Sequence, residues 1–278
     1  MTVIVTDSTA DIPSALAKAL DIHVIPLLVN FGSESFADGV EITNDQFYRK
    51  LTESNDLPTT SQPSVGAFEE LYRSLGGPDQ PIISIHIAAQ LSGTIRSAQQ
   101  AKDLLPDYDI RVIDSESTTM SLGWAVIIAA RAAKAGKSPD EIVALTESVV
   151  KRTRLLAGLD TLRFLEKGGR IGKTRALLGT LLSVKPIINV LEGEVRPFEQ
   201  VRTKKKVIAR IAEVAKDLAP FDELCVLYSR NEDEARAFLE QLSSIHPREK
   251  IMMAEIGAVV GTHIGPGAIG FTGVRKGV

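Results

Sequence analysis

Short runs of β-branched and other apolar residues alternate along this chain with longer segments whose apolar residues recur at helical spacing. The short runs predict strands at residues 3–5, 24–29, 82–87, 110–113, 155–159, 224–228 and 250–256. The longer segments predict helices at residues 13–20, 67–75, 94–105, 122–134 and 139–150. This alternation is typical of an α/β protein with a mainly parallel, Rossmann-like sheet.

One segment breaks this rhythm. In PIINVLEGEVRPFEQVR, residues 186–202, two extended runs flank Glu192 and Gly193, which predicts a β-hairpin. Since a hairpin does not belong in a parallel sheet, we expect a second unit with a mixed sheet. The sequence therefore predicts two α/β domains, 1–150 and 151–278, with an approximate boundary.

The composition excludes several classes of protein. Charged residues make up 24% and hydrophobic residues 44% of the 278 residues, and the net charge is -3. These values are typical of a soluble globular protein and predict no nucleic-acid partner. The single cysteine, Cys225, forms no intramolecular disulfide and indicates a reducing compartment. Because residues 1–11 lack the features of a secretory signal, we expect a cytoplasmic protein.

Only four histidines and one cysteine are present, and they are widely spaced. No group of residues therefore has the spacing of a metal site, and we expect neither a metal nor a cofactor.

The stretch GPGAIG matches the G-x-G-x-x-G pattern of a dinucleotide-binding turn at Gly265, Gly267 and Gly270. Such a turn opens a helix, and an acidic residue follows about 20 positions later. Only FTGVRKGV follows Gly270, which leaves no room for either feature. We conclude that GPGAIG is not a nucleotide site.

A second glycine-rich stretch, KGGRIGKTRALLG, contains the GKT of a phosphate-binding loop. The first glycine of that motif would fall at position 167, where the chain has Lys167. The preceding LDTLRFLEK has helical spacing, whereas a phosphate loop follows a buried strand. We interpret Gly168 and Gly169 as the left-handed end of a helix.

Three loops gather small hydroxyl side chains: PTTSQPSVGAF (58–68), QLSGTIRSAQQA (90–101) and VIDSESTTMSLG (112–123). Each alone is typical of a helix N-cap. Together, beyond the ends of strands and at the starts of helices, they predict a site for a small anionic group. Ser92 lies in L-S-G-T and lacks the G-x-S-x-G context of a hydrolase nucleophile, but the sequence leaves open whether Ser92 and His263 pair in space.

Six motifs together resemble the DegV family, whose characterised members include the fatty-acid-binding subunits of bacterial fatty acid kinase. The motifs extend over nearly the whole chain: DSTADIP (7–13), TTSQPSVGAF (59–68), LSGT (91–94), DSESTTMSLG (114–123), KGGRIG (167–172) and GTHIGPGA (261–268). The resemblance implies two α/β domains with a long-chain acyl ligand buried between or beside them. Its carboxylate would be held by the polar loops, to which the C-terminal strands return.

The resemblance also implies roles for individual residues. Thr60, Ser61, Ser92 and His263 would bind the carboxylate, and Gly93 and Thr94 would offer backbone amides. Arg170 would face the partner kinase or the acyl phosphate. Two departures from the family pattern, Trp124 after SLG and Ile95 after SGT, lead us to expect both as residues of the acyl tunnel.

The function expected from this resemblance is that of a non-catalytic binding protein. It would take a long-chain fatty acid during transient contact with a membrane surface and present the carboxylate to a separate ATP-binding fatty acid kinase subunit. Two alternatives remain open at this stage. The protein could be an acyl hydrolase using Ser92 and His263 or a nucleotide-dependent acyltransferase using GGRIGKT; alternatively, it could be a lipid-sensing regulator without chemistry.

Overall fold

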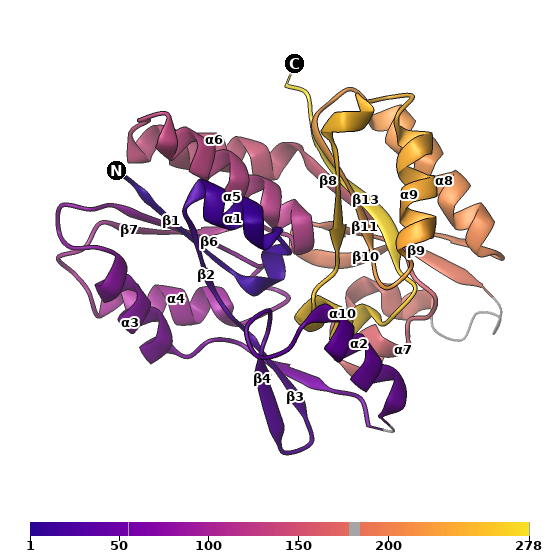
Figure 1. Ribbon diagram of the computed structural model, residues 1–278, viewed down its shortest axis with the longest axis horizontal. Coiled ribbons are helices and arrows are strands. Elements are labelled where there is room, and N and C mark those ends of the chain that lie inside the picture. Colours follow the sequence, from indigo (N-terminus) through magenta and orange to yellow (C-terminus); the bar gives the residue numbers. More distant parts are fainter. Residues whose placement is uncertain (55, 178–183, 278) are drawn as a thin grey trace.

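Two β-sheets with a helical layer between them form the body of the protein (Figure 1). A computed structural model describes residues 1–54, 56–177 and 184–277. The first sheet is parallel, with strand order β2-β1-β6-β7. Its strands are β1 (Val3–Asp7), β2 (Ile22–Ile25), β6 (Ile82–His86) and β7 (Ile110–Asp114).

The second sheet is mixed, with strand order β10-β9-β8-β13-β11-β12. Only β11 and β12 pair in parallel, and the other neighbours are antiparallel. The strands are β8 (Thr153–Gly158), β9 (Lys185–Leu191), β10 (Glu194–Val201), β11 (Phe221–Tyr228), β12 (Ile251–Glu255) and β13 (Ile269–Arg275). A parallel sheet followed by a mixed sheet with a β9–β10 hairpin confirms the predicted fold class.

Helices cover both sheets. α3 (Val65–Leu75) and α4 (Thr94–Asp103) lie on the outer face of the parallel sheet, and α8 (Lys204–Leu218) and α9 (Glu232–Leu242) lie on the outer face of the mixed sheet (Figure 1). The layer between the sheets holds α5 (Thr119–Lys134), flanked by α1 (Ser14–Leu20) and α6 (Pro139–Arg152). As predicted, Ser138 caps α6 ahead of Pro139.

The two-residue period of the strands directs alternate side chains to different cores. In β1, Ile4 packs in the central core, whereas Val5 packs against α3 and α4. In β8, Leu155 belongs to the central core and Leu156 to the core beneath α8 and α9. Both sheets are therefore covered on two faces, which explains why their strands read as continuous apolar runs.

A small third sheet, with order β4-β3-β5, lies beside the body. It consists of β3 (Leu28–Phe31), β4 (Glu34–Ala37) and β5 (Thr59–Ser61) and packs with α2 (Asn44–Glu53) and α10 (Ala258–Ile264). The remaining helical segments are α7 (Arg163–Lys167), η1 (Ser8–Ala10), η2 (Gly172–Leu177) and η3 (Arg248–Lys250).

The structure corrects three local predictions. The strand predicted at 24–29 is interrupted at Pro26 and Leu27, so that β2 and β3 belong to different sheets. His263, which lies outside all the helices predicted from the sequence, belongs to the last turn of α10. Of the two glycines predicted to end a helix in left-handed geometry, only Gly169 has a positive φ, at 70°. The domain boundary near residue 150 stays a proposal, although the mixed sheet begins at β8.

None of the helices in the described part of the chain has the length and apolar character needed to cross a bilayer.

The glycines of GPGAIG shape the connection between α10 and β13. Gly265 and Gly267 have φ values of 74° and 82°, which other residues rarely adopt. Gly270 lies in β13 opposite Ala157 of β8, and a methyl group there would lie 2.2 Å from the carbonyl oxygen of Leu156. The glycines therefore serve a turn and a close approach of two strands.

We expect Gly270→Ala to lower the free energy of unfolding by about 1 to 3 kcal/mol, because the clash is with backbone atoms. Urea denaturation followed by circular dichroism measures this. Gly77→Ala is the matched control, since no atom lies within 4 Å of a methyl group at that position. Equal stability of the two variants would contradict the close approach.

Candidate functional site

A cavity of about 380 Å³ lies between the inner face of the mixed sheet and the loops that follow the parallel strands. Its walls come from four parts of the chain. The mixed sheet forms one wall, α10 and the region of α7 form a second, and the loops after β6 and β7 form a third. The fourth is β5 with the residue that follows it, Gln62.

The wall formed by the mixed sheet is apolar because it consists of alternate residues of neighbouring strands. Leu155 and Ala157 of β8 line it, as do Ile188 and Val190 of β9. Leu227 of β11 adds to the same surface and is 1% exposed. This wall can hold a hydrocarbon but offers no side-chain hydrogen bond.

The opposite end of the cavity is polar and open to solvent. Thr60, Ser61, Ser92, Arg170 and His263, all predicted site residues, line the cavity. Ser61 is exposed, and the other four are partly exposed. The structure thus brings all five residues that we expected to use their side chains to one cavity, from segments that lie up to 203 positions apart.

His263 is hydrogen-bonded to Thr60, with 2.9 Å between Nε2 and Oγ1. Its Nδ1 is buried and has no partner within the described chain. Gly168 packs directly on the ring, since a methyl group there would lie 2.2 Å from Nδ1. Burial, with a smaller contribution from Arg170, lowers the pKa of His263 to about 4. The imidazole is therefore neutral at neutral pH.

Arg170 supplies positive charge at the mouth. Its Nε donates to the carbonyl oxygen of Leu91 at 3.2 Å, and its Nη1 donates to that of Gly168 at 2.8 Å. No Asp or Glu of the described chain pairs with this guanidinium, and none lines the cavity. A carboxylate entering the mouth would therefore meet a cation without competition from an acidic side chain.

The LSGT loop is used differently from our expectation. The Oγ of Ser92 lies 2.9 Å from Oγ1 of Thr94, and the amide of Thr94 donates to Ser92 at 3.3 Å. Neither Gly93 nor Thr94 lines the cavity; Thr94 is fully buried, and Gly93 packs against Gln62. Thr94 therefore orients the Ser92 hydroxyl. We predicted that the Thr94 amide would bind the ligand, but this amide donates to Ser92 instead.

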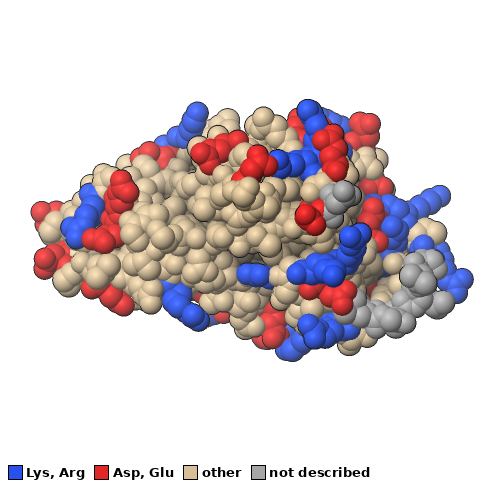
Figure 2. Space-filling model, turned by 90° about the horizontal axis from the view of Figure 1, so that it is seen from below, with Lys and Arg blue, Asp and Glu red and all other residues tan. Residues whose placement is uncertain are grey.

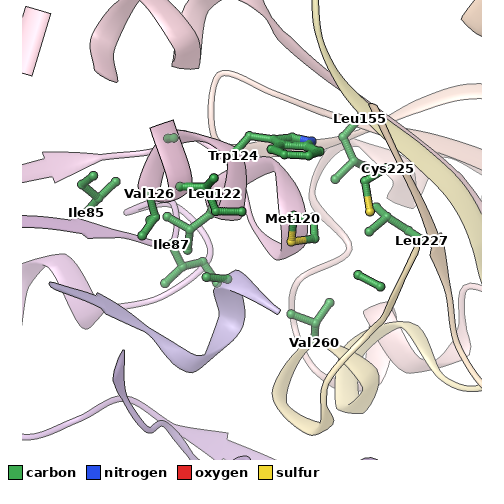
Figure 3. Packing of buried hydrophobic residues seen from close by; sticks show 14 of the residues in the cluster. Ile85, Ile87, Met120, Leu122, Trp124, Val126, Leu155, Cys225, Leu227 and Val260 are labelled. Atoms are coloured by element: carbon green, nitrogen blue, oxygen red, sulfur yellow. The ribbon is translucent and has the colours of Figure 1, made fainter. Parts of the chain in front are cut away.

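The two residues expected in the tunnel, Trp124 and Ile95, are not among those that line the cavity. Trp124 is fully buried in α5, and Figure 3 shows its indole beside Leu155, which does line the cavity. Ile95 lies in the first turn of α4. Our prediction was wrong because a bulky apolar residue after a polar motif does not reveal whether it faces the ligand or supports the wall.

The geometry at the mouth does not fit a hydrolase. His263 contacts Thr60 and not Ser92, and no carboxylate in the described chain orients its ring. A Ser–His–Asp arrangement occurs elsewhere: His86 Nε2 lies 2.6 Å from Ser84 Oγ, and its Nδ1 lies 2.9 Å from Asp7. All three residues are fully buried. Ser84 also accepts from Tyr72, at 2.8 Å, so this relay is part of the core.

The lysine and the threonine of the GKT sequence both interact with other residues of the protein. Lys173 forms an ion pair with Glu194, and Thr174 is fully buried with its hydroxyl directed at the carbonyl of Val195. In a phosphate loop the lysine and the hydroxyl would reach the nucleotide and its metal ion. This arrangement therefore offers no nucleotide site.

Sequence reasoning missed three polar residues of the cavity, Gln62, Thr118 and Thr119. The serines of the hydroxyl-rich 112–123 loop, Ser115, Ser117 and Ser121, line a neighbouring cavity instead. Thr119 has a φ of 49°, which is unusual for a β-branched residue. The repeated hydroxyl residues of this loop indicated a polar site. They did not indicate which of these side chains line the cavity.

Comparison with known proteins agrees with this architecture. A family model described as "Uncharacterised protein, DegV family" matches residues 1–276. The chain belongs to the DegV family. It is 37% identical to Protein DegV of Bacillus subtilis over 271 residues, which cover 96% of each chain.

Two solved structures of the DegV fold resemble this chain over nearly its whole length. A DegV family protein from Thermus thermophilus, described as fatty acid binding, has a TM-score of 0.91 and 33% identity, with 99% of each chain covered. A stearic-acid-binding protein from Eubacterium ventriosum has a TM-score of 0.90 and 28% identity, also with 99% of each chain covered.

The lowered pKa of His263 predicts a pH dependence of stability. The unfolded chain takes up this proton near pH 6.5 and the folded protein only near pH 4, so His263 reduces stability as pH falls from 6.5 to 4. The full effect is up to about 3 kcal/mol. His263→Gln should remove it, as measured by denaturant unfolding of the ligand-free protein across this range.

The comparison must be made with the variant and not read from the wild-type curve alone. Burial raises the pKa of Asp38 to about 6, and this group changes stability in the opposite direction over the same range. If the curves for wild type and His263→Gln run parallel between pH 4 and 6.5, His263 is not the buried neutral group described.

Proposed function

We propose that this protein binds a long-chain fatty acid, with the carboxylate at the polar mouth and the hydrocarbon chain along the mixed sheet. The observation that carries the proposal is the division of one cavity into a cationic, hydroxyl-lined mouth and an apolar interior. The two solved relatives described as binding fatty acids support it.

The energetics favour a ligand with both parts. Each buried methylene contributes about 0.8 kcal/mol, so a long acyl chain supplies on the order of 10 kcal/mol before the costs of ordering it. An unpaired carboxylate taken from water would offset several kcal/mol of that gain. Hydroxyls of Thr60, Ser61 and Ser92, the His263 ring and the Arg170 charge reduce this loss.

We further propose that the bound carboxylate is presented to a separate, ATP-binding kinase subunit for acyl-phosphate formation. The partly exposed mouth supports this, because a carboxylate held there stays accessible while the chain is buried. Arg170 suits the product as well as the ligand, since a phosphate adds negative charge next to a cation that pairs with no acidic side chain of the described residues.

In this proposal the protein is not itself an enzyme and lies in the cytoplasm, where it meets membranes only transiently. One feature of its surface supports such contact. On the face seen in Figure 2, an area from left of centre to the middle is largely free of charged side chains, whereas Lys, Arg, Asp and Glu side chains gather on the right half and at the left end. A surface of this kind can approach a bilayer without removing many charges from water.

Two measurements test the class of ligand: identification of the molecule that is bound to the purified protein, and the effect of substitutions at the mouth on its affinity. Denaturing extraction followed by mass spectrometry should release an intact C14 to C18 fatty acid. Thr60→Val and Ser92→Ala should each weaken palmitate binding by roughly 1 to 3 kcal/mol, because the bound carboxylate loses one hydrogen-bond donor. Fluorescence displacement measures this, with Ser74→Ala as a control outside the cavity.

Release of a nucleotide, or a covalent acyl adduct on Ser92, would overturn this assignment in favour of catalysis. Unchanged palmitate affinity in both variants would overturn the assignment of Thr60 and Ser92 to the carboxylate.

The role of Arg170 is tested separately. We expect Arg170→Ala to lower palmitate affinity less than tenfold. With the kinase subunit and ATP present, the loss in the rate of acyl-phosphate formation should be about tenfold larger than the loss in palmitate affinity. The reason is that the product carries more negative charge than the carboxylate. Arg163→Ala is the control, since Arg163 is exposed on α7 and does not line the cavity. Equal losses in both assays would show that Arg170 serves ligand binding alone.

A further inference from the structure

A second cavity of about 290 Å³ adjoins the first one. It lies among the start of α5, the end of α6 and the β9–β10 hairpin, with Ser117, Ser121, Arg154 and Glu192 in its lining. Leu155 and Val190 line both cavities. These two side chains therefore form a partition between the two spaces.

Along β8, the partition lies away from α7. Leu159 lies just after β8 and shortly before α7, and Leu155 precedes it by four residues, or about 13 Å of extended strand. In the β8–β9 ladder, Leu156 pairs with Asn189 and Ala157 with Ile188. Leu155 and Val190 are the residues just beyond the last pair of that ladder, and both line the first and the second cavity.

The lining changes character at this partition. On the near side, Leu155, Val190, Ala157 and Ile188 present only hydrocarbon to the ligand. On the far side, the hydroxyl of Ser121 lies 2.6 Å from that of Thr272, and the hydroxyl of Ser115 donates to the carbonyl of Ser117 at 3.2 Å. Methylenes that pass the partition therefore leave an apolar environment for a polar one, and they gain less than those before it.

Leu155 is held in place from behind. It is 5% exposed, and the fully buried indole of Trp124 lies beside it (Figure 3). Val190 is partly buried and is followed closely by the Glu192–Gly193 turn of the hairpin. Because packed side chains resist displacement, an acyl chain that reaches Leu155 must end there or displace it.

We propose that Leu155, supported by Trp124 and paired with Val190, sets the maximum length of the acyl chain, and that the second cavity accepts the end of longer chains only when this partition is opened. This inference rests on the proposed fatty-acid binding and adds the residues that determine specificity. It also assigns Trp124 an indirect role, through Leu155.

The experiment compares two neighbouring leucines of one strand. Leu155→Ala should join the two cavities, whereas Leu156→Ala creates space on the opposite face of β8, beneath α8. Both leucines are nearly buried, at 5% and 4% exposure, so both variants should lose comparable stability. Relative affinities for saturated fatty acids from C12 to C22 are measured by displacement of one fluorescent fatty acid.

We expect Leu155→Ala to shift the preferred length by at least two methylenes, which corresponds to a roughly tenfold change in the ratio of affinities for the longer and the shorter acid. Leu156→Ala should keep the wild-type ratio. Leu155→Phe should shift the preference toward shorter acids, and it provides a second variant that creates no cavity.

An unchanged length preference in both Leu155 variants, with fatty acids still bound, would overturn the partition and leave the proposed function intact. A shift of equal size in Leu156→Ala would overturn it too, because the change would then follow from stability and not from the shape of the cavity. Failure of the wild-type protein to bind any fatty acid would instead refute the proposed function itself.

Discussion

The hydrogen bond between Thr60 and His263 joins two parts of the chain on which the whole site depends. Thr60 belongs to the small sheet near the N-terminal end of the sequence, and His263 to α10 near the other end. Ser92 and Arg170 approach the same mouth from two further segments. The binding site therefore exists only in the complete fold, and no single segment of the sequence contains it.

The fold class and the meeting of polar loops beyond the strands could be predicted from the sequence for definite physical reasons. Strands covered on both faces read as continuous apolar runs, and the turn at Glu192 and Gly193 has positive φ values at both residues, as hairpins of this kind require. The hydroxyls near Thr60 and Ser92 mark the starts of helices beyond strands, where anions are favoured.

The individual residues that line the cavity could not be predicted, because this depends on the direction of each side chain and on contacts between residues distant in the sequence. The apolar wall uses Leu155 but not Leu156, and only the pairing of β8 with its neighbours decides which of the two faces the cavity. In the same way, Trp124 supports the wall without lining it, and Thr94 contacts Ser92 rather than a ligand. Gly168 has its place because His263 packs against it, a contact between residues 95 positions apart in the sequence.

The position of α5 has a consequence for the protein as a whole. Nearly all of this helix is buried, and it packs on the parallel sheet and on the mixed sheet. Neither half can lose its structure without exposing the apolar surface that it shares with the other half through α5. Heating should therefore melt the chain in one cooperative step, and any molecule lodged in the cavity would strengthen both halves at once.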